Sequence, residues 1–224
     1  MSSILIYGGT FNPPTVAHQA AVRIGAEHAD EVWVLPAYHH RFKHPDPEMM
    51  RAHFDMRMDL CRHAFGRVSV SGGAIDPVVK VLALELLNPT GATKDLVVLL
   101  KRLYPGHEFG FMIGQDAADE IQEGKWVDGL QLVKDNHFLV LSRSEDCKPA
   151  PGSWYCLPEG AFMLSKTFLF LKRWEGSGLH QVSSTAAREC LGNKDFEGAA
   201  QSLPPEVLSL ILEKGYYDAT TDIR

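Results

Sequence analysis

The chain has 224 residues, of which 45% are hydrophobic and 22% are charged, a balance typical of a folded globular protein and not of a disordered one. Lysine and arginine number 22 against 28 aspartates and glutamates, giving a net charge of −6. This charge argues against broad binding to a nucleic-acid backbone, but it allows a local basic pocket for a phosphate ligand. The N-terminus lacks the pattern of a signal peptide, and no apolar run approaches the ~20 residues that span a bilayer, so we expect a cytoplasmic protein.

The predicted elements alternate between strands and helices. Buried strands are expected at residues 3–7, 31–36, 67–71, 107–113 and 137–142. Helices are expected at residues 16–28, 47–64, 93–103, 117–123, 127–133, 184–191 and 205–214. This order predicts a doubly wound α/β fold, a parallel sheet covered by helices on both faces. No repeat or linker is visible, so we expect one domain over residues 1–224, within which the segment 144–178 is not assigned.

The first candidate motif, Gly8–His18, lies between the first strand and the first helix and reads G-G-T-F-N-P-P-T-V-A-H. Ligands in such folds bind beyond the carboxyl ends of strands, and the start of a helix offers N–H groups and a positive dipole to an anion. Thr15 is placed either to cap this helix or to donate to a phosphate, and His18 can face the same ligand. Taken alone, the segment is more typical of an ordinary strand–turn–helix with a hydrogen-bonded histidine. It is neither a Walker A loop nor a G-x-G-x-x-G turn.

The second candidate motif, Val182–Arg188, opens a helix near the C-terminus and reads V-S-S-T-A-A-R. Hydroxyl groups at a helix start can cap the helix and can donate to phosphate oxygens. Arg188, one turn later, can bring a fork-shaped charge to the same anion. Alone, this pattern is better explained by ordinary capping beside a solvated arginine.

The two motifs together resemble signatures of the nucleotidylyltransferase superfamily. The first resembles G-G-(S/T)-F-D/N-P-x-H-x-G-H, with Thr15 at the first histidine, Ala17 at the glycine, and His18 retained. The second matches I/V-S-S-T-x-x-R, and the tail Pro205–Tyr217 resembles the closing helix of bacterial members. The chain looks closest to the nicotinate or nicotinamide mononucleotide adenylyltransferases. That resemblance implies a Rossmann-like fold and an enzyme of NAD biosynthesis, which transfers the adenylyl group of ATP to a pyridine mononucleotide and releases pyrophosphate.

The resemblance also implies roles for individual residues. Those implied in catalysis are His18, Thr15, Lys43 and Arg188. Those implied to bind ATP are Gly8, Gly9, Thr10, Phe11, His18, Gly114, Asp116, Ser183, Ser184, Thr185 and Arg188. Those implied to bind the mononucleotide are Asn12, Lys43, Thr93, Trp126 and Arg143, with Trp126 stacking on the pyridine ring. Mg²⁺ is expected to accompany ATP with mainly water ligands, and no protein ligand is assigned to it.

The choice of substrate is less determined. Ala92 replaces a tyrosine found in many nicotinate enzymes, whereas Thr93 and Asp95 match their Y-T-x-D-T-L element. We expect a preference for nicotinate mononucleotide with measurable activity on the amide. The expected partners are these nucleotides, without nucleic acid or membrane, and a homo-oligomer is allowed. The alternatives are another nucleotidylyltransferase, such as a phosphopantetheine adenylyltransferase, and a non-catalytic nucleotide sensor. The Ser-Ser-Thr-x-x-Arg element argues against the first, and the presence of both His18 and Arg188 against the second.

Overall fold

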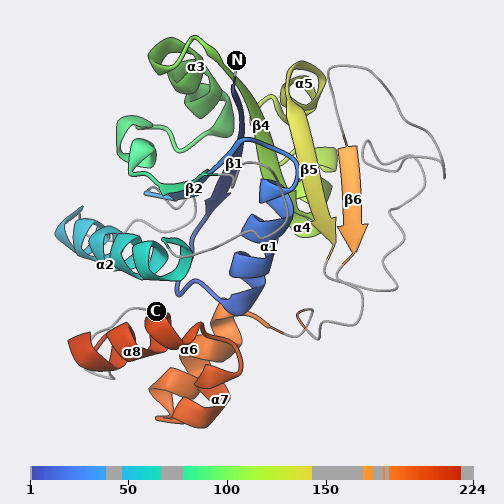
Figure 1. The fold of residues 1–224 in the computed structure, drawn as a ribbon. Coiled ribbons are helices and arrows are strands. Elements are labelled where there is room, and N and C mark those ends of the chain that lie inside the picture. Colours follow the sequence, from blue (N-terminus) through green and yellow to red (C-terminus); the bar gives the residue numbers. More distant parts are fainter. Residues whose placement is uncertain are drawn as a thin grey trace.

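A computed structural model of the protein describes residues 2–38, 47–66, 78–142, 169–173, 179 and 182–217. Within these residues, one sheet contains the parallel strands β1 (Ser2–Gly9), β2 (Glu31–Pro36), β3 (Val78–Val81), β4 (His107–Gly114), β5 (His137–Ser142) and β6 (Leu169–Arg173). Their order is β3-β2-β1-β4-β5-β6 (Figure 1). The order reverses between the central strands β1 and β4, and in such sheets ligands bind beyond the carboxyl ends of the strands at this point. The predicted fold class is confirmed.

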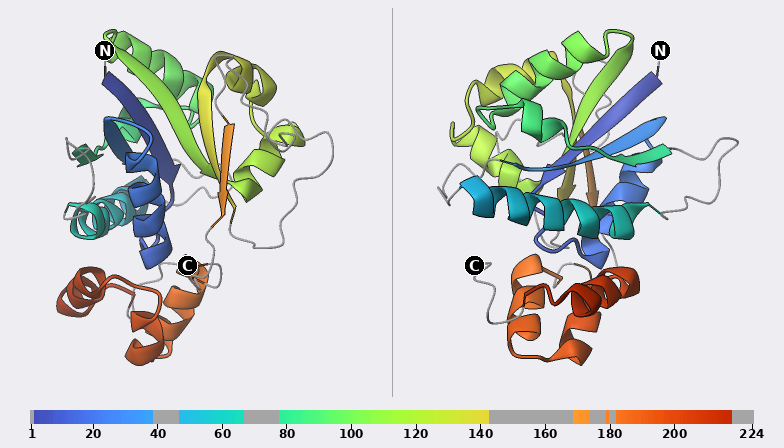
Figure 2. Two further views of the ribbon diagram at one scale, coloured as in Figure 1. Left: turned by 45° about the vertical axis from the view of Figure 1, so that its right-hand side comes forward. Right: turned by 90° about the vertical axis from the view of Figure 1, so that its left-hand side faces the viewer.

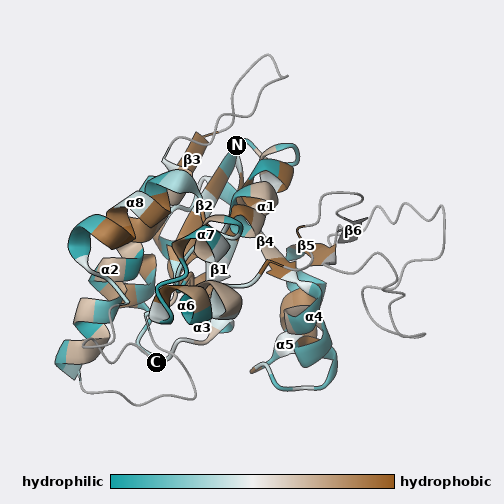
Figure 3. Ribbon diagram, turned by 90° about the horizontal axis from the view of Figure 1, so that it is seen from below, coloured by the Kyte–Doolittle hydropathy of each residue, from teal (hydrophilic) through white to brown (hydrophobic). Residues whose placement is uncertain are grey.

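Two hydrophobic cores cover the two faces of the sheet. Alternate residues of β1 point to opposite sides, so Leu5 joins one core while Ile4 and Ile6 join the other. The first core includes α1 (Val16–Ala26) and α2 (Pro47–Phe65). The second includes α3 (Thr93–Leu103), α4 (Gln115–Gln122) and α5 (Gly129–Asp135), with the short 3₁₀ helix η1 (Leu84–Leu87) before α3. Helices such as α2 and α8 carry both hydrophobic and hydrophilic residues (Figure 3).

The C-terminal helices α6 (Ser184–Gly192), α7 (Phe196–Ala200) and α8 (Pro205–Lys214) gather below the carboxyl ends of the strands (Figure 2). Buried side chains of all three helices belong to the same core as α1 and α2. This packing places the second motif, at the start of α6, next to the edge of the sheet where the first motif lies. Two segments that are some 170 residues apart in the chain are therefore neighbours, as the bond between Ser184 and Pro13 shows.

Most predicted elements are found with small changes in their bounds. The first helix ends at Ala26 instead of His28, α4 begins at Gln115, and α5 spans Gly129–Asp135 instead of 127–133. The elements β3, β6, η1 and α7 were not predicted, because each has five residues or fewer and too little periodicity to recognise. The predicted strand 67–71 lies outside the described residues, and the expectation of one domain stays a prediction. Among the described residues, no helix is both long enough and apolar enough to cross a bilayer.

Candidate active site

Thr15 and His18 form a reciprocal cap at the start of α1. The Thr15 side chain accepts from the His18 backbone N–H at 3.4 Å, and the Thr15 backbone N–H donates to His18 Nδ1 at 2.9 Å. The Thr15 hydroxyl is also 2.8 Å from His18 Nδ1. Because Nδ1 accepts the backbone N–H, the neutral imidazole carries its hydrogen on Nε2. Thr15 is 1% exposed, so of its two predicted roles the structure shows the capping one.

Two aromatic side chains pack against the His18 ring. The buried Phe11 ring meets it edge-on, with 5.1 Å between centroids, and Tyr7 lies 6.2 Å away. Gly9 makes room for this arrangement, because a Cβ there would lie 3.0 Å from the Phe11 ring. The Phe11 side chain is therefore part of the core, and only its backbone can meet a nucleotide.

The second motif is bound directly to the first. Arg188 Nη1 donates to the Asn12 carbonyl at 2.6 Å, and Ser184 Oγ donates to the Pro13 carbonyl at 2.7 Å. Tyr217 follows α8, and its hydroxyl donates to Asn12 Oδ1 at 2.5 Å. Burial raises the pKa of Tyr217, so this phenol stays protonated and keeps its donor. These bonds join the N-terminal loop to the C-terminal helices at the carboxyl edge of the sheet.

Several groups predicted to bind phosphate already have protein partners. The Val16 N–H at the start of α1 donates to the Ser202 carbonyl at 3.0 Å. Ser183 caps α6 by accepting from the Ala186 N–H at 3.1 Å. Thr185 is exposed and accepts from Arg188 Nη2 at 3.4 Å. Thr185, whose exposed hydroxyl keeps its own hydrogen to donate, and Arg188, whose guanidinium has further N–H donors, therefore suit a phosphate better than Ser183 and Ser184 do.

Arg57 on α2 was missed by the sequence analysis. It is 7% exposed, and it donates to the carbonyls of Thr10 and Ala37, both at 2.8 Å. These two residues directly follow β1 and β2, so Arg57 joins the ends of both strands. The sequence did contain a signal that Arg57 is buried. Arg57 lies at helical spacing from Phe54, Leu60 and Cys61, which are all core residues, so it falls on the apolar face of the helix.

Gly114 and Asp116 lie at the carboxyl end of β4, next to β1 across the switch point. A Cβ at position 114 would collide with Asp116 Oδ1, so any larger residue there would displace the Asp116 carboxylate. Asp116 is exposed, so its carboxylate is accessible to a ligand. The contact of Asp116 with a ribose stays a prediction.

Thr93 and Trp126 line one small cavity of about 150 Å³. Thr93 begins α3, and Trp126 lies between α4 and α5. Trp126 Nε1 donates to Glu120 Oε2 at 3.1 Å, which fixes the indole, and Glu120 and Lys125 line the same cavity. The structure thus brings together two residues that the sequence assigned to the pyridine mononucleotide. Two others, Lys43 and Arg143, lie outside the described residues.

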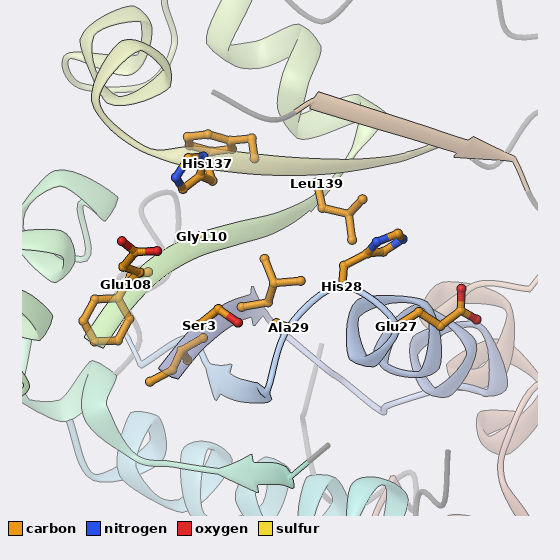
Figure 4. A pocket seen from close by; sticks show the side chains of 12 residues that line it. Ser3, Glu27, His28, Ala29, Glu108, Gly110, His137 and Leu139 are labelled. Atoms are coloured by element: carbon orange, nitrogen blue, oxygen red, sulfur yellow. The ribbon is translucent and has the colours of Figure 1, made fainter. Parts of the chain in front are cut away.

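A larger cavity of about 460 Å³ lies at the opposite edge of the sheet. It is lined by the first residues of β1, β4 and β5 and by the turn after α1, including Ser3, His28, Glu108 and His137 (Figure 4). No residue predicted for the site lines it. Because ligands of parallel sheets bind at the carboxyl ends, this cavity is not the nucleotide site.

The comparisons with known proteins agree with this geometry. The cytidylyltransferase-like family matches residues 6–190. A probable nicotinate-nucleotide adenylyltransferase of Exiguobacterium sibiricum is 31% identical over 159 residues, which cover 70% of this chain and 73% of the relative. The chain belongs to the nicotinate-nucleotide adenylyltransferase family. The predicted resemblance is confirmed, and so is the prediction of a nucleotidylyltransferase enzyme.

The similarity to other members of the nicotinate-nucleotide adenylyltransferase family extends over nearly the whole chain. A probable nicotinate-nucleotide adenylyltransferase of Anaeromyxobacter sp. (strain K) is 29% identical and covers 96% of both chains. The nicotinic acid mononucleotide adenylyltransferase of Plasmodium falciparum, solved with APC, has a TM-score of 0.66 at 22% identity, covering 97% of this chain and 98% of that chain. The same Plasmodium enzyme solved with NaAD has a TM-score of 0.64. These structures share the fold described above.

Proposed function

We propose that the protein transfers the adenylyl group of ATP to nicotinate mononucleotide in NAD biosynthesis. A phosphate oxygen of the mononucleotide attacks the α-phosphorus of ATP. The bond from that phosphorus to the oxygen bridging it to the β-phosphorus breaks, and pyrophosphate leaves with the electron pair. The products are the dinucleotide and pyrophosphate, and the protein forms no covalent intermediate.

The observation that carries this proposal is the contact between the two motifs. Arg188 and Ser184 bind the backbone of Asn12 and Pro13, which places the start of α6 beside the loop that leads to His18. Histidine and arginine side chains, one from each motif, thereby serve one ligand at the switch point of the sheet. A chain that only packed these helices together would not need an imidazole donor from one motif and a guanidinium from the other there.

The chemical difficulty of the reaction is the repulsion between two anions and the charge that develops on the leaving group. Fixed donors and cations address both, because they are already oriented before the reaction begins. In this proposal His18 donates from Nε2 to an oxygen near the α-phosphorus, and Arg188 with Thr185 holds the outer phosphates. Lys43 neutralises a further phosphate. Thr15 acts through His18, whose ring it orients, and does not touch the nucleotide.

We propose that Mg²⁺ enters with ATP and is bound by phosphate oxygens and water. The described residues contain no cluster of His, Cys, Asp or Glu side chains that would hold a metal ion, so we name no protein ligand for Mg²⁺. When bound, it withdraws charge from the phosphates and aligns them for displacement. The backbone at Gly8, Gly9 and Thr10 and the Asp116 carboxylate complete the proposed ATP site.

The small cavity beside Trp126 is the proposed pyridine subsite. Its indole offers a flat face for stacking, worth roughly 0.5–1.5 kcal/mol beyond area burial. The start of α3 and the Thr93 hydroxyl offer donors and a positive dipole to the nicotinate carboxylate. Glu120 contributes a negative charge to the same cavity and can accept from the amide of nicotinamide. These opposing features support a preference for the acid with measurable activity on the amide, while Asn12 and Arg143 hold the rest of the mononucleotide.

Turnover with each mononucleotide tests the proposal. Purified protein is given ATP, Mg²⁺ and either nicotinate or nicotinamide mononucleotide, and release of pyrophosphate and formation of dinucleotide are followed. We expect a higher kcat/KM for nicotinate mononucleotide. Trp126→Ala should weaken both substrates by a similar factor, because stacking does not distinguish the ring substituents. Absence of dinucleotide with either substrate would refute adenylyl transfer, and a preference for the amide would refute only the substrate assignment.

A further inference from the structure

Arg57 carries a buried charge, and no acidic side chain among the described residues pairs with it. The guanidinium is bonded to the carbonyls of Thr10 and Ala37, and it lies over the Phe54 ring, 5.7 Å from the centroid. Among the described residues, none of the ion pairs involves Arg57. Burial lowers the pKa of Arg57, and two titratable groups that interact with it, Cys61 and Tyr217, have pKa values raised by burial and stay neutral.

A buried cation without a counter-ion is costly, and neutral donors could have joined two strand ends more cheaply. The position of this buried charge in the fold indicates what it serves. Thr10 belongs to the first motif, and Ala37, whose N–H donates to the Gly9 carbonyl at 2.8 Å, lies beside it. A few residues further along the same loop, the Asn12 carbonyl accepts from Arg188 of α6. Arg188 likewise forms no ion pair among the described residues. The loop is therefore bound by two arginines that pair with no acidic side chain in the part of the chain that the structure describes.

We propose that Arg57 is a positioning residue for the phosphates of ATP, and that their negative charge is its missing counter-ion. This inference rests on the proposed function. Arg57 acts in two ways. Its guanidinium fixes the ends of β1 and β2, and its positive charge makes the loop of the first motif attractive to an anion before one binds. The charge need not touch the nucleotide, because Coulomb interactions in a poorly hydrated site extend over several ångströms.

A purely structural role predicts a different pattern from the proposed one. If Arg57 only joins two strands, its replacement lowers the stability of the ligand-free protein and leaves the affinity of the folded protein for anions unchanged. If its charge also serves the ligand, affinity follows the charge at this position and not the number of hydrogen bonds. Lysine and glutamine separate these cases, because lysine keeps the charge and glutamine keeps a neutral donor.

The test is isothermal titration of the full chain with ATP and, separately, with inorganic pyrophosphate. Arg57→Gln should raise Kd for both by about tenfold, the effect expected for one charge in a partly shielded site. Arg57→Lys should remain within about threefold of the wild type, although both variants melt at lower temperature. Steady-state kinetics should show the loss in KM for ATP more than in kcat. The control is Arg62→Gln, the same substitution on the same helix at an exposed arginine paired with Asp59, which should bind as the wild type does.

The outcomes are distinct. Weaker binding by Arg57→Gln, rescue by Arg57→Lys and normal binding by Arg62→Gln support the inference. Equal Kd values for folded Arg57→Gln and Arg62→Gln overturn it, as does an Arg57→Lys variant that binds as poorly as Arg57→Gln. If the glutamine variant does not fold, the lysine variant still decides, since tenfold weaker binding there contradicts a role for charge. Wild-type protein that does not bind ATP refutes the proposed function itself.

Discussion

Replacing Thr15 with valine tests how the first motif positions His18. Valine has nearly the same shape, so the substitution at this buried position removes the hydroxyl without leaving a cavity. The helix loses its side-chain cap, and the His18 backbone N–H loses its acceptor. Loss of such a cap costs about 1–2 kcal/mol of unfolding free energy. In a chain of this length, that corresponds to a melting temperature lower by roughly 2–8 °C.

The effect on turnover should be modest by comparison. In Thr15→Val the backbone N–H of residue 15 still donates to His18 Nδ1, so the imidazole keeps its hydrogen on Nε2. Only the second contact to Nδ1, from the hydroxyl, is lost. We therefore expect kcat to fall by no more than about tenfold, against ~10²–10³ for His18→Ala, which removes the donor itself. Thr15→Ser keeps the hydroxyl and should retain both stability and turnover.

Urea unfolding gives the unfolding free energy and pyrophosphate release gives kcat, both measured on the same preparations. If Thr15→Val matches His18→Ala in lost turnover while its unfolding free energy is unchanged, the hydroxyl contacts the phosphates and the capping role is wrong. If both quantities equal those of the wild type, the hydroxyl contributes to neither.

Three further substitutions test other contacts. Arg188→Lys should weaken ATP binding and also cost the ligand-free protein about 1 kcal/mol, because the bond to the Asn12 carbonyl is lost; an unchanged melting temperature would contradict that bond. Tyr217→Phe should raise KM for the mononucleotide severalfold, since Asn12 loses the donor that orients its amide, and an unchanged KM would remove Asn12 from the site. Burial raises the pKa of Glu85 to about 6 from 4.5, so the folded protein holds this proton more tightly than the unfolded chain. The wild type should then lose up to ~2 kcal/mol of stability as pH rises from about 4.5 to above 6, and Glu85→Gln should not; urea unfolding at pH 5 and pH 8 compares them, and parallel profiles would refute the burial argument.

The sequence alone determined the fold class and the two motifs. Apolar runs such as residues 31–36 and 107–113 have the length of buried strands, and helical periodicity between them indicates a parallel sheet. Gly8–His18 and Val182–Arg188 were recognisable because their residue types and order are specific. Short elements such as β3 and α7 were not, since four or five residues carry too little pattern, and their conformation is set by the neighbours they pack against.

Only the tertiary structure decided what each polar group in the motifs does. A hydroxyl such as that of Ser183 or Thr15 can cap a helix or donate to a phosphate, and its local sequence is the same in both cases. The choice depends on which partner lies within hydrogen-bond distance, and for Ser184 that partner is a carbonyl 171 residues away. The role of Arg57 was hidden for the same reason. Its contacts to Thr10 and Ala37 exist only because two strands end side by side, which is a property of the assembled sheet and not of any one segment.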